Sequence, residues 1–542
     1  MKTKKWIAGM LSVLFASTFA LAGCTSTPGG VSTPPAGNSS SEVPEVQGGQ
    51  LNIFLNEQGY GSDWLRALGA KFQELFGTQV LVVADPSNSI GTDAIGNETS
   101  QYDLVFSGAA ITQYVSKGQL VNINDVFNTK PSGEDKTVAE KLASTGMEEL
   151  FRFGSNYYML PWETTFSSFH YNVNVLNSVF GEGKWEEPVT TDELLDMLEE
   201  LKEIESAKPA DTRAYGVVIS PELNYWMYAV ETWWGQYEGY DDFYNYYYGE
   251  YYDGNTKKVA TDQAGYRKSL DVTGRLRALE VLTEILNEKN GHVNPVSEGL
   301  GYVEHQEQLA SGKYQSNKNP SAFLVCGDWY EKETFAAVQQ NGEPVRFMRM
   351  PVISSITETL EDKDMSDETL AEVIRAIDAG KTEYAGVSAN DFARIKEARQ
   401  MISCGTMNHT VAIPKNARNI DNAKAFLVFM ASDLGQSIFA QQNGGRTQPY
   451  GYDATNDSSI TISKYTQSIL DAYGKEFLPV TMDYRSPLVA FGGLTNYGNQ
   501  AALDITFWKN NSTPKAYHDY AVDYEAKRYD QIKMYISSSV RN

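Results

Sequence analysis

Strands alternate with amphipathic helices where the folded part of the chain begins. Apolar runs predict strands over residues 51–55, 79–84 and 102–106. Between the first two, apolar side chains at helical spacing predict a helix that Asp63 caps and Gly77 ends, with the buried stripe Leu65, Leu68, Phe72, Leu75 and Phe76. This alternation favours an α/β sheet with its loops gathered at the carboxyl ends of the strands.

Two later helices are equally well marked. Thr190, Thr191 and Glu193 form a capping-box pattern ahead of the apolar stripe Leu194, Met197, Leu198, Leu201 and Ile204. A further helix is expected after a cap at Asp421. Residues 355–400 carry many charges and are interpreted as solvated helices in an insertion.

The N-terminus has the pattern of an exported lipoprotein. Residues 1–23 begin with Lys2, Lys4 and Lys5 and continue as an uncharged apolar run, which is typical of a signal peptide. The run ends at Leu-Ala-Gly-Cys, so lipidation at Cys24 is expected, and two acyl chains give firm membrane binding. An ordinary signal with a chance cysteine is the alternative. Residues 24–49 are rich in Gly, Pro, Ser and Thr and are predicted to be a disordered tether.

Composition narrows the class of protein. The 542 residues carry 69 acidic and 45 basic side chains, a formal charge of −24. This charge argues against non-specific binding to nucleic acid, which requires basic surface. The apolar fraction of 42% is that of a globular chain.

Aromatic residues concentrate in one segment. Between Tyr225 and Tyr252, 14 of 28 residues are aromatic, among them Trp226, Trp233 and Trp234. Aromatic faces with polar tips suit a pyranose ring, which is apolar on its flat side and hydroxylated at its rim. Stacking that removes about 100 Å² of apolar surface contributes roughly 2.5 kcal/mol. Packing within a core is the other interpretation of these residues.

Several separated segments together resemble one family, the extracellular solute-binding lipoproteins of ABC sugar importers, which are similar in plan to maltose-binding protein. The segments include GQLVNINDVF at 118–127, YYMLPWETTFSSFHYNVNVL at 157–176, PVTTDELLDMLEELK at 188–202, QLASGK at 308–313, FLVCGDWYE at 323–331 and the stretch from His409 to Arg446. Residues 225–260 and 355–400 match no part of the family's pattern.

The resemblance implies a two-lobed, type II periplasmic-binding-protein-like α/β fold with hinged lobes and a central cleft. Lobe one would comprise residues 50–161 and 410–485, and lobe two residues 162–409 and 486–542. The chain would cross between the lobes near residues 161–169 and 406–413. The solute would bind in the cleft, and hinge motion would close the lobes around it.

Candidate ligand-binding residues follow strands or lie at the crossings. Asp328 and Trp329 follow the strand at 322–325, and the family position that matches Trp329 commonly stacks on sugar. The other candidates are Glu57 and Tyr60 after the first strand, Ser107 after the third, Trp162 and Glu163 at the first crossing, Arg446 after a helix, and the aromatic group Trp226, Trp233 and Trp234. For each of these residues, the alternative is a role in packing or a solvent-exposed position, with no contact to a ligand.

Catalytic and metal motifs are missing from the sequence. The five histidines stand far apart, and neither a P-loop nor a GxSxG elbow is present. No cofactor or metal is therefore expected, although Asp453 and Asp457 leave a calcium site open. Cys326 and Cys404 are expected as free buried thiols, with a disulfide between them as the alternative.

The leading hypothesis is a non-catalytic receptor that captures a carbohydrate, expected to be an oligosaccharide, and delivers it to ABC permease subunits. It would act as a monomer, lipid-anchored to the outer face of a monoderm bacterium, with no nucleic acid as partner. A surface glycoside hydrolase is the first alternative, since aromatic clefts with two carboxylates serve both. A binding protein for a non-sugar solute is the second.

Overall fold

The computed structural model describes residues 43, 45–57, 59–85, 93–108, 110–219, 225–311, 319–474, 476–496 and 513–536, with the side chain of Tyr302 left out. The predicted signal segment, Cys24 and most of the tether lie outside this set. None of the helices within it is both long and apolar enough to cross a membrane.

The first sheet has the strand order β2-β1-β3-β12-β4. β1, β2 and β3 are parallel, and β12 runs antiparallel to both β3 and β4. β1 buries its apolar residues on both faces, as expected of a parallel strand covered on both sides. The strands are β1 (Gln50–Asn56), β2 (Gln79–Asp85), β3 (Leu104–Phe106), β4 (Met159–Pro161) and β12 (Thr410–Ala412).

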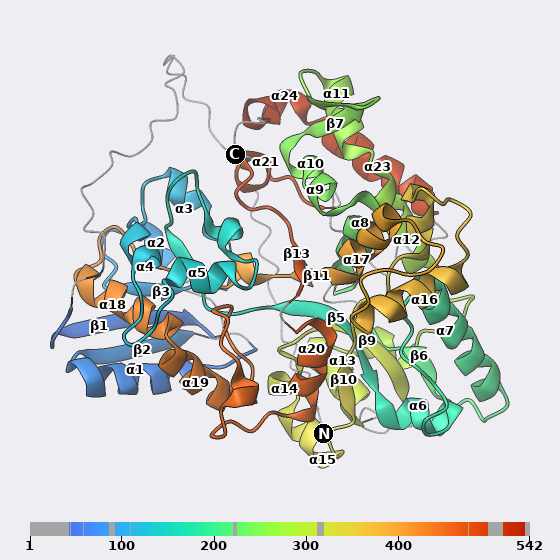
Figure 1. Ribbon diagram of the computed structural model, residues 1–542, viewed down its shortest axis with the longest axis horizontal. Helices are drawn as coiled ribbons and strands as arrows, with labels where there is room; N and C mark the ends of the chain where they lie inside the picture. Colours follow the sequence, from blue (N-terminus) through green and yellow to red (C-terminus); the bar gives the residue numbers. More distant parts are fainter. Residues whose placement is uncertain are drawn as a thin grey trace, which may run out of the picture. The chain divides into compact units, whose positions relative to one another are not determined.

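Helices from both ends of the sequence cover this sheet. Figure 1 shows α18 and α19, late in the chain, beside α1 and β1. The short elements between strands are α2 (Asp93–Gly96), α3 (Gln113–Ser116), α4 (Asn124–Asn128), α5 (Val138–Ala143) and the 3-10 helix η1 (Glu148–Phe151). The longer helices are α1 (Asp63–Phe76), α18 (Ile420–Ala431) and α19 (Asp433–Gln442).

The predicted α1 is confirmed, with two differences at its ends. Gly77 closes the helix in the left-handed region with φ 67°, which glycine adopts without a steric penalty. Asp63 is the first helical residue, and Ser62 takes the N-cap position without a side-chain bond. Leu75 is 44% exposed and does not belong to the buried stripe, whereas Phe76 is partly buried and packs against Phe72 and Phe429. Likewise Asn419, not Asp421, precedes α18.

The second sheet has the order β13-β11-β5-β9-β6, with β10 paired to β5. Its strands are mixed in direction: β5 runs antiparallel to β9, β10 and β11. The strands are β5 (Phe166–Asn172), β6 (Tyr215–Val217), β9 (Ser321–Gly327), β10 (Val345–Phe347), β11 (Met401–Cys404) and β13 (Leu478–Val480). A separate hairpin pairs β7 (Glu250–Asp253) with β8 (Thr256–Val259).

The remaining helices of the described residues pack on the second sheet or on one another, apart from η5, which lies near α19. The longer ones are α6 (Val173–Phe180), α7 (Thr191–Ser206), α8 (Trp226–Glu238), α11 (Gln263–Leu270), α12 (Thr273–Leu286), α13 (Tyr302–Ser311), α16 (Asp367–Asp378), α17 (Ala389–Gln400), α20 (Lys464–Tyr473) and α23 (Pro514–Ala526). The short ones are α9 (Tyr240–Phe243), α10 (Asn245–Tyr248), α14 (Tyr330–Glu333), α15 (Phe335–Gln340), α21 (Pro487–Ala490), α24 (Tyr529–Ile532), and the 3-10 helices η2 (Pro295–Gly299), η3 (Ser354–Thr359), η4 (Thr406–Asn408), η5 (Ala454–Asn456) and η7 (Lys533–Tyr535).

Two helix predictions in this region have clear outcomes. α7 begins as predicted, since the Thr190 hydroxyl accepts a hydrogen bond from the Glu193 backbone. Helices also form at 367–378 and 389–400, but α16 is amphipathic rather than merely solvated. It buries Leu370, Val373 and Ile374 in the hydrophobic cluster around the second sheet.

The chain passes between the two sheets at short segments. Residues 162–165 lead from β4 to β5, and residues 405–409 lead back from β11 to β12. α20 then packs on β10 and β13 pairs with β11, so residues 464–480 lie with the second sheet. The expected lobe one had included them, because sequence pattern alone cannot say which sheet a three-residue strand joins.

Candidate functional site

Four predicted residues from four distant segments form one buried cluster. Tyr60 lies between β1 and α1, Glu163 lies in the first crossing, Asp328 follows β9, and Arg446 follows α19. Arg446 Nη2 donates to Glu163 Oε1 at 2.8 Å and to Asp328 Oδ2 at 2.5 Å. The Tyr60 hydroxyl donates to Asp328 Oδ1 at 2.5 Å, and the guanidinium lies 4.9 Å from the centre of the Tyr60 ring. The cluster therefore joins both sheets and the segment between them.

The ionisable side chains of this cluster are buried more deeply than is usual for charged groups. Glu163 and Asp328 are 0% and 1% exposed, and they share a single guanidinium. Burial, opposed by Arg446, raises the pKa of Glu163 to about 8 and also raises the pKa of Asp328. Glu163 Oε2 accepts no hydrogen bond from the described residues. A buried polar oxygen without a hydrogen-bond partner is costly, and the raised pKa favours the protonated acid at neutral pH, so Oε2 is suited to donate to or accept from a polar group of a ligand.

Trp162 supports the cluster instead of presenting a free face. It is 1% exposed, and its ring stacks on Trp64 with centroids 5.4 Å apart. Its indole nitrogen donates to the carbonyl of Ser107 at 3.0 Å, and the edge of Tyr60 packs against it. The predicted residues Trp162 and Ser107 therefore hold the start of the first crossing in place.

Trp329 is half-buried and stands at the N-cap of α14. Its indole lies so closely across Gly327 that a Cβ there would meet the ring at 2.0 Å. Tyr225 and Tyr228 approach it edge-on, with centroids 5.8 and 6.4 Å away. A Cβ on Gly59, in the loop after β1, would lie 2.9 Å from the Trp329 Cβ. The indole thus lies where segments attached to both sheets meet.

The aromatic group of α8 has a different place from the one expected. Trp233 and Trp234 are 0% exposed, and Trp226 is 5% exposed and packs edge-on against Phe169. Trp233 donates to the carbonyl of Pro351, and Trp234 packs against Phe243. These three residues build the core beside the second sheet, because α8 lies between that sheet and α12 and is covered on all sides.

Glu57 also stays apart from the buried cluster. It is half-buried and accepts a hydrogen bond from Ser62 at 2.8 Å. It therefore orders the loop that carries Tyr60 and does not contact Arg446 in this arrangement.

A cavity of about 450 Å³ borders the cluster, lined in part by Tyr60, Asp328 and Arg446. It also contains side chains that the sequence did not single out, notably Phe335, which is 58% exposed, and Lys332. Both residues lie within ten positions after the GDW sequence, so their proximity to this motif could have identified them as candidates. An exposed aromatic ring beside buried polar groups is typical of a small-molecule site.

Neither a metal-ligand group nor a disulfide is found among the described residues. They contain no group of three or more His, Cys, Asp or Glu side chains arranged to hold a metal ion. Asp453 caps η5, and Asp457 accepts from Ser437, Tyr452 and Ser459. Cys326 and Cys404 are buried free thiols and form no disulfide with each other.

Two α/β sheets joined by short crossings, with a buried polar cluster between them, define a protein of the solute-binding class. The family model described as "Bacterial extracellular solute-binding protein" matches residues 57–437, and the chain belongs to that family. This confirms the family resemblance and places the protein among extracellular solute-binding proteins.

Among solved structures, the GacH receptor of Streptomyces glaucescens GLA.O is similar to this chain, with a TM-score of 0.56 and 16% identity. The match covers 90% of this chain and 99% of the receptor, whose structures are described unliganded and with acarbose or an acarbose homolog. The predicted fold class is confirmed. A comparison with curated protein sequences returns no significant match.

Proposed function

We propose that this protein captures a neutral carbohydrate, an oligosaccharide, between two lobes and delivers it unchanged to the permease of an ABC transporter. One lobe is built on the first sheet and the other on the second, with residues 162–165 and 405–409 as hinge segments. The protein acts as a monomer. The arrangement around Arg446 is the observation that carries the proposal, because it gathers polar and aromatic groups from both lobes at one place.

Each group of the site has a role suited to a sugar. Trp329 is only partly buried, and its indole is the group that would stack on a pyranose ring. Glu163 Oε2 has no hydrogen-bond partner within the described residues, and a sugar hydroxyl can either accept from it or donate to it. Asp328, Tyr60 and Arg446 connect the lobes, so a solute that bonds to any of them favours closure by differential affinity for the closed form.

The solved neighbour supports the choice of solute. The GacH receptor is described in complex with acarbose, and it shares this chain's fold over nearly its full length. Membership of the family supports delivery to a permease, since extracellular solute-binding proteins transfer their ligands to membrane transporters.

A glycoside hydrolase is the alternative, since Glu163 and Asp328 are two neighbouring carboxylates. Hydrolysis requires the scissile bond between the two carboxyl groups. Here both bind the same nitrogen of Arg446, and the guanidinium fills the space between them. This arrangement favours binding over hydrolysis.

The proposal is tested by calorimetry against a panel of neutral oligosaccharides. We expect binding of at least one member, with no new reducing ends released over hours. Trp329→Ala should weaken that binding at least tenfold, about 1.4 kcal/mol, while lowering the melting temperature only slightly.

Trp233→Ala is the matched control. This fully buried indole should cost about 3–5 kcal/mol of stability and leave the affinity of the folded protein unchanged. Release of sugar fragments would support the hydrolase, and equal affinity in Trp329→Ala would remove that residue from the site.

A further inference from the structure

A second and larger cavity, of about 1190 Å³, opens between α20, β10 and the C-terminal ends of α16 and α17. All of its lining residues lie between Tyr171 and Glu476, and those in strands come from the second sheet. Only Ile462, Ser463 and Lys464 also border the cavity beside Arg446. The two cavities are therefore distinct sites.

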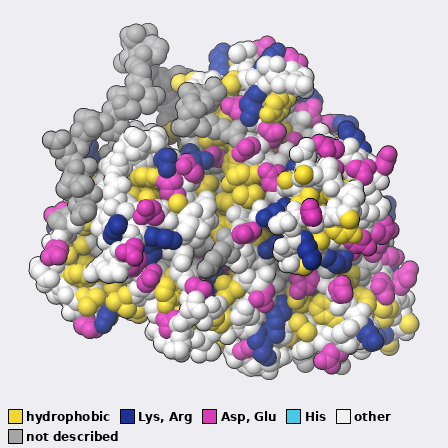
Figure 2. All heavy atoms as spheres, in the orientation of Figure 1, with side chains coloured by type: hydrophobic (Ala, Val, Ile, Leu, Met, Phe, Trp, Pro, Cys, Tyr) yellow, Lys and Arg dark blue, Asp and Glu magenta, His cyan; other side chains and the backbone are white. Residues whose placement is uncertain are grey.

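Basic groups outnumber acidic ones in this cavity, although the whole chain is strongly acidic. The acidic lining residues are Glu187, Asp378, Asp471 and Glu476. The basic ones are Arg346, Arg349, Lys381, Lys396, Arg399 and Lys464. Figure 2 shows Lys and Arg side chains gathered on the surface over α16 and α17.

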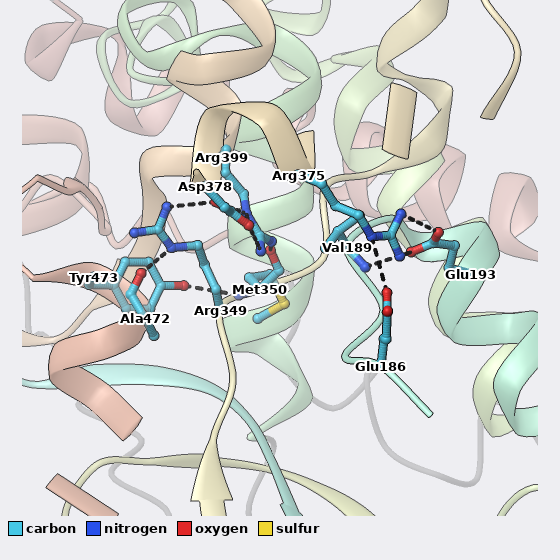
Figure 3. Close-up of polar contacts among 10 residues, drawn as sticks. All are labelled: Glu186, Val189, Glu193, Arg349, Met350, Arg375, Asp378, Arg399, Ala472 and Tyr473. Carbon is cyan, nitrogen blue, oxygen red and sulfur yellow. Dashed lines mark hydrogen bonds and ion pairs between the residues drawn. The ribbon is translucent and has the colours of Figure 1, made fainter. Parts of the chain in front are cut away.

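Several of these charges lack a neutralising partner. Arg349 and Arg399 approach Asp378 from different elements and share this one carboxylate, as Figure 3 shows. Within the described residues, Arg346 and Lys381 form no ion pair, and the Arg346 guanidinium donates only to backbone carbonyls. Among the acids, Glu187 accepts from the Tyr171 hydroxyl at 2.5 Å. The surplus of charge in the cavity is thus positive.

The arginines at the base are held in fixed positions. Arg399 is 4% exposed and donates to the Met350 carbonyl at 3.0 Å as well as to Asp378. Arg349 lies over the Tyr473 ring at 5.2 Å and donates to the Ala472 carbonyl. Burial, and to a smaller extent the nearby Arg399 cation, lower the pKa of Arg349. By contrast, Arg375 at the other side of Figure 3 is paired with Glu193 and Glu186.

We propose that this cavity is a second binding site, separate from the site between the lobes, for a soluble small molecule that carries two or more carboxylate or phosphate groups. Guanidinium groups recognise such oxygens through paired, charge-assisted hydrogen bonds. The volume suits a small molecule better than a single inorganic ion. A flat lipid surface fits poorly, because the Arg399 side chain is only 5% exposed and a ligand must enter the cavity to reach it.

The test uses citrate and pyrophosphate as probes in calorimetry on the whole mature protein at about 20 mM salt, where screening is weak. We expect at least one probe to bind, with an affinity that falls as salt rises. The double variant Lys381→Gln, Lys396→Gln should lose affinity about tenfold, since each removed charge contributes at an accessible site. The matched control is Lys130→Gln with Lys415→Gln, two exposed lysines outside this cavity, and it should bind as the wild type does.

Three results of the binding measurements would overturn the proposal, and competition by a neutral oligosaccharide would be a fourth. The three are no binding of either probe at low salt, equal affinity in the double variant and the control, and binding only to phosphatidylglycerol vesicles. Trp329→Ala should bind the anion normally, and a neutral oligosaccharide should not compete with it. Competition would place the anion between the lobes instead, so this outcome is separate from any failure of the carbohydrate proposal.

Discussion

At the scale of single residues, Gly327 determines where the most important aromatic ring of the proposed site lies. The glycine ends β9, and the Trp329 indole folds back across it, so that three ring atoms would lie 2.0 to 2.3 Å from a Cβ. No side chain fits in that space. The glycine in the GDW sequence is therefore required by the ring two residues later, not by its own backbone angles.

Gly327→Ala should displace the Trp329 indole and weaken carbohydrate binding about as much as Trp329→Ala does, at least tenfold, or about 1.4 kcal/mol. Calorimetry measures the loss, and the change in tryptophan fluorescence on adding ligand reports the position of the indole. Gly299→Ala is the matched control, because a Cβ there meets nothing within 4 Å. Wild-type affinity in Gly327→Ala would show that the indole face is not used.

At the scale of elements, α8 shows how an aromatic segment can serve a core. The helix contacts α12 on one side and strands β5, β9 and β11 on the other. It also buries one acid, Glu231, which accepts a hydrogen bond from Asn496 and is 6% exposed. Burial raises the pKa of Glu231 to about 8.

This pKa predicts how stability depends on pH. Between about pH 4.5, where an unfolded glutamate loses its proton, and about pH 8, the folded protein holds a proton that the unfolded chain has released. Glu231 therefore lowers the free energy of unfolding as the pH rises through that window. The glutamine of Glu231→Gln does not titrate. Within this pH window, the free energy of unfolding of the variant should therefore rise relative to that of the wild type by up to about 1.4 kcal/mol per pH unit.

Urea unfolding at pH 5 and pH 8 measures this difference. Glu383→Gln, at an exposed position, controls for the loss of one negative charge. A constant gap between Glu231→Gln and the wild type at both pH values would contradict the prediction.

At the scale of the whole molecule, the cluster around Arg446 is assembled from residues far apart in sequence. Arg446 and Glu163 are separated by 283 positions, and Arg446 and Asp328 by 118. Two sheets can bring them together only because the chain crosses between the sheets repeatedly. The family's extracellular location agrees with the predicted export signal, and we propose that Cys24 carries the lipid anchor.

The anchor is tested by Cys24→Ser expressed in a bacterium. Without a thiol there is nothing to acylate, so the variant should leave the membrane fraction and appear in the soluble exported fraction. Labelling with a radioactive fatty acid should be lost at the same time. Cys326→Ser, which changes a buried thiol in the folded body, should remain with the membrane. Persistent membrane fractionation of Cys24→Ser would locate the anchor elsewhere.

The amino-acid sequence by itself was enough to determine the local features of this protein. The first strands, the start of α7 and the Gly77 helix end were correct, because apolar spacing and capping act over a few residues. Family membership was also accessible, since short motifs in a fixed order carry it.

Only the tertiary structure decided which aromatic and charged residues meet. Trp233 and Trp329 look alike in sequence, yet one is fully buried in a core and the other is only partly buried. Likewise, β13 pairs with β11 in the second sheet, although residues 410–485 were expected in lobe one from the sequence. Burial and pairing depend on contacts between distant segments, and no local pattern encodes those contacts.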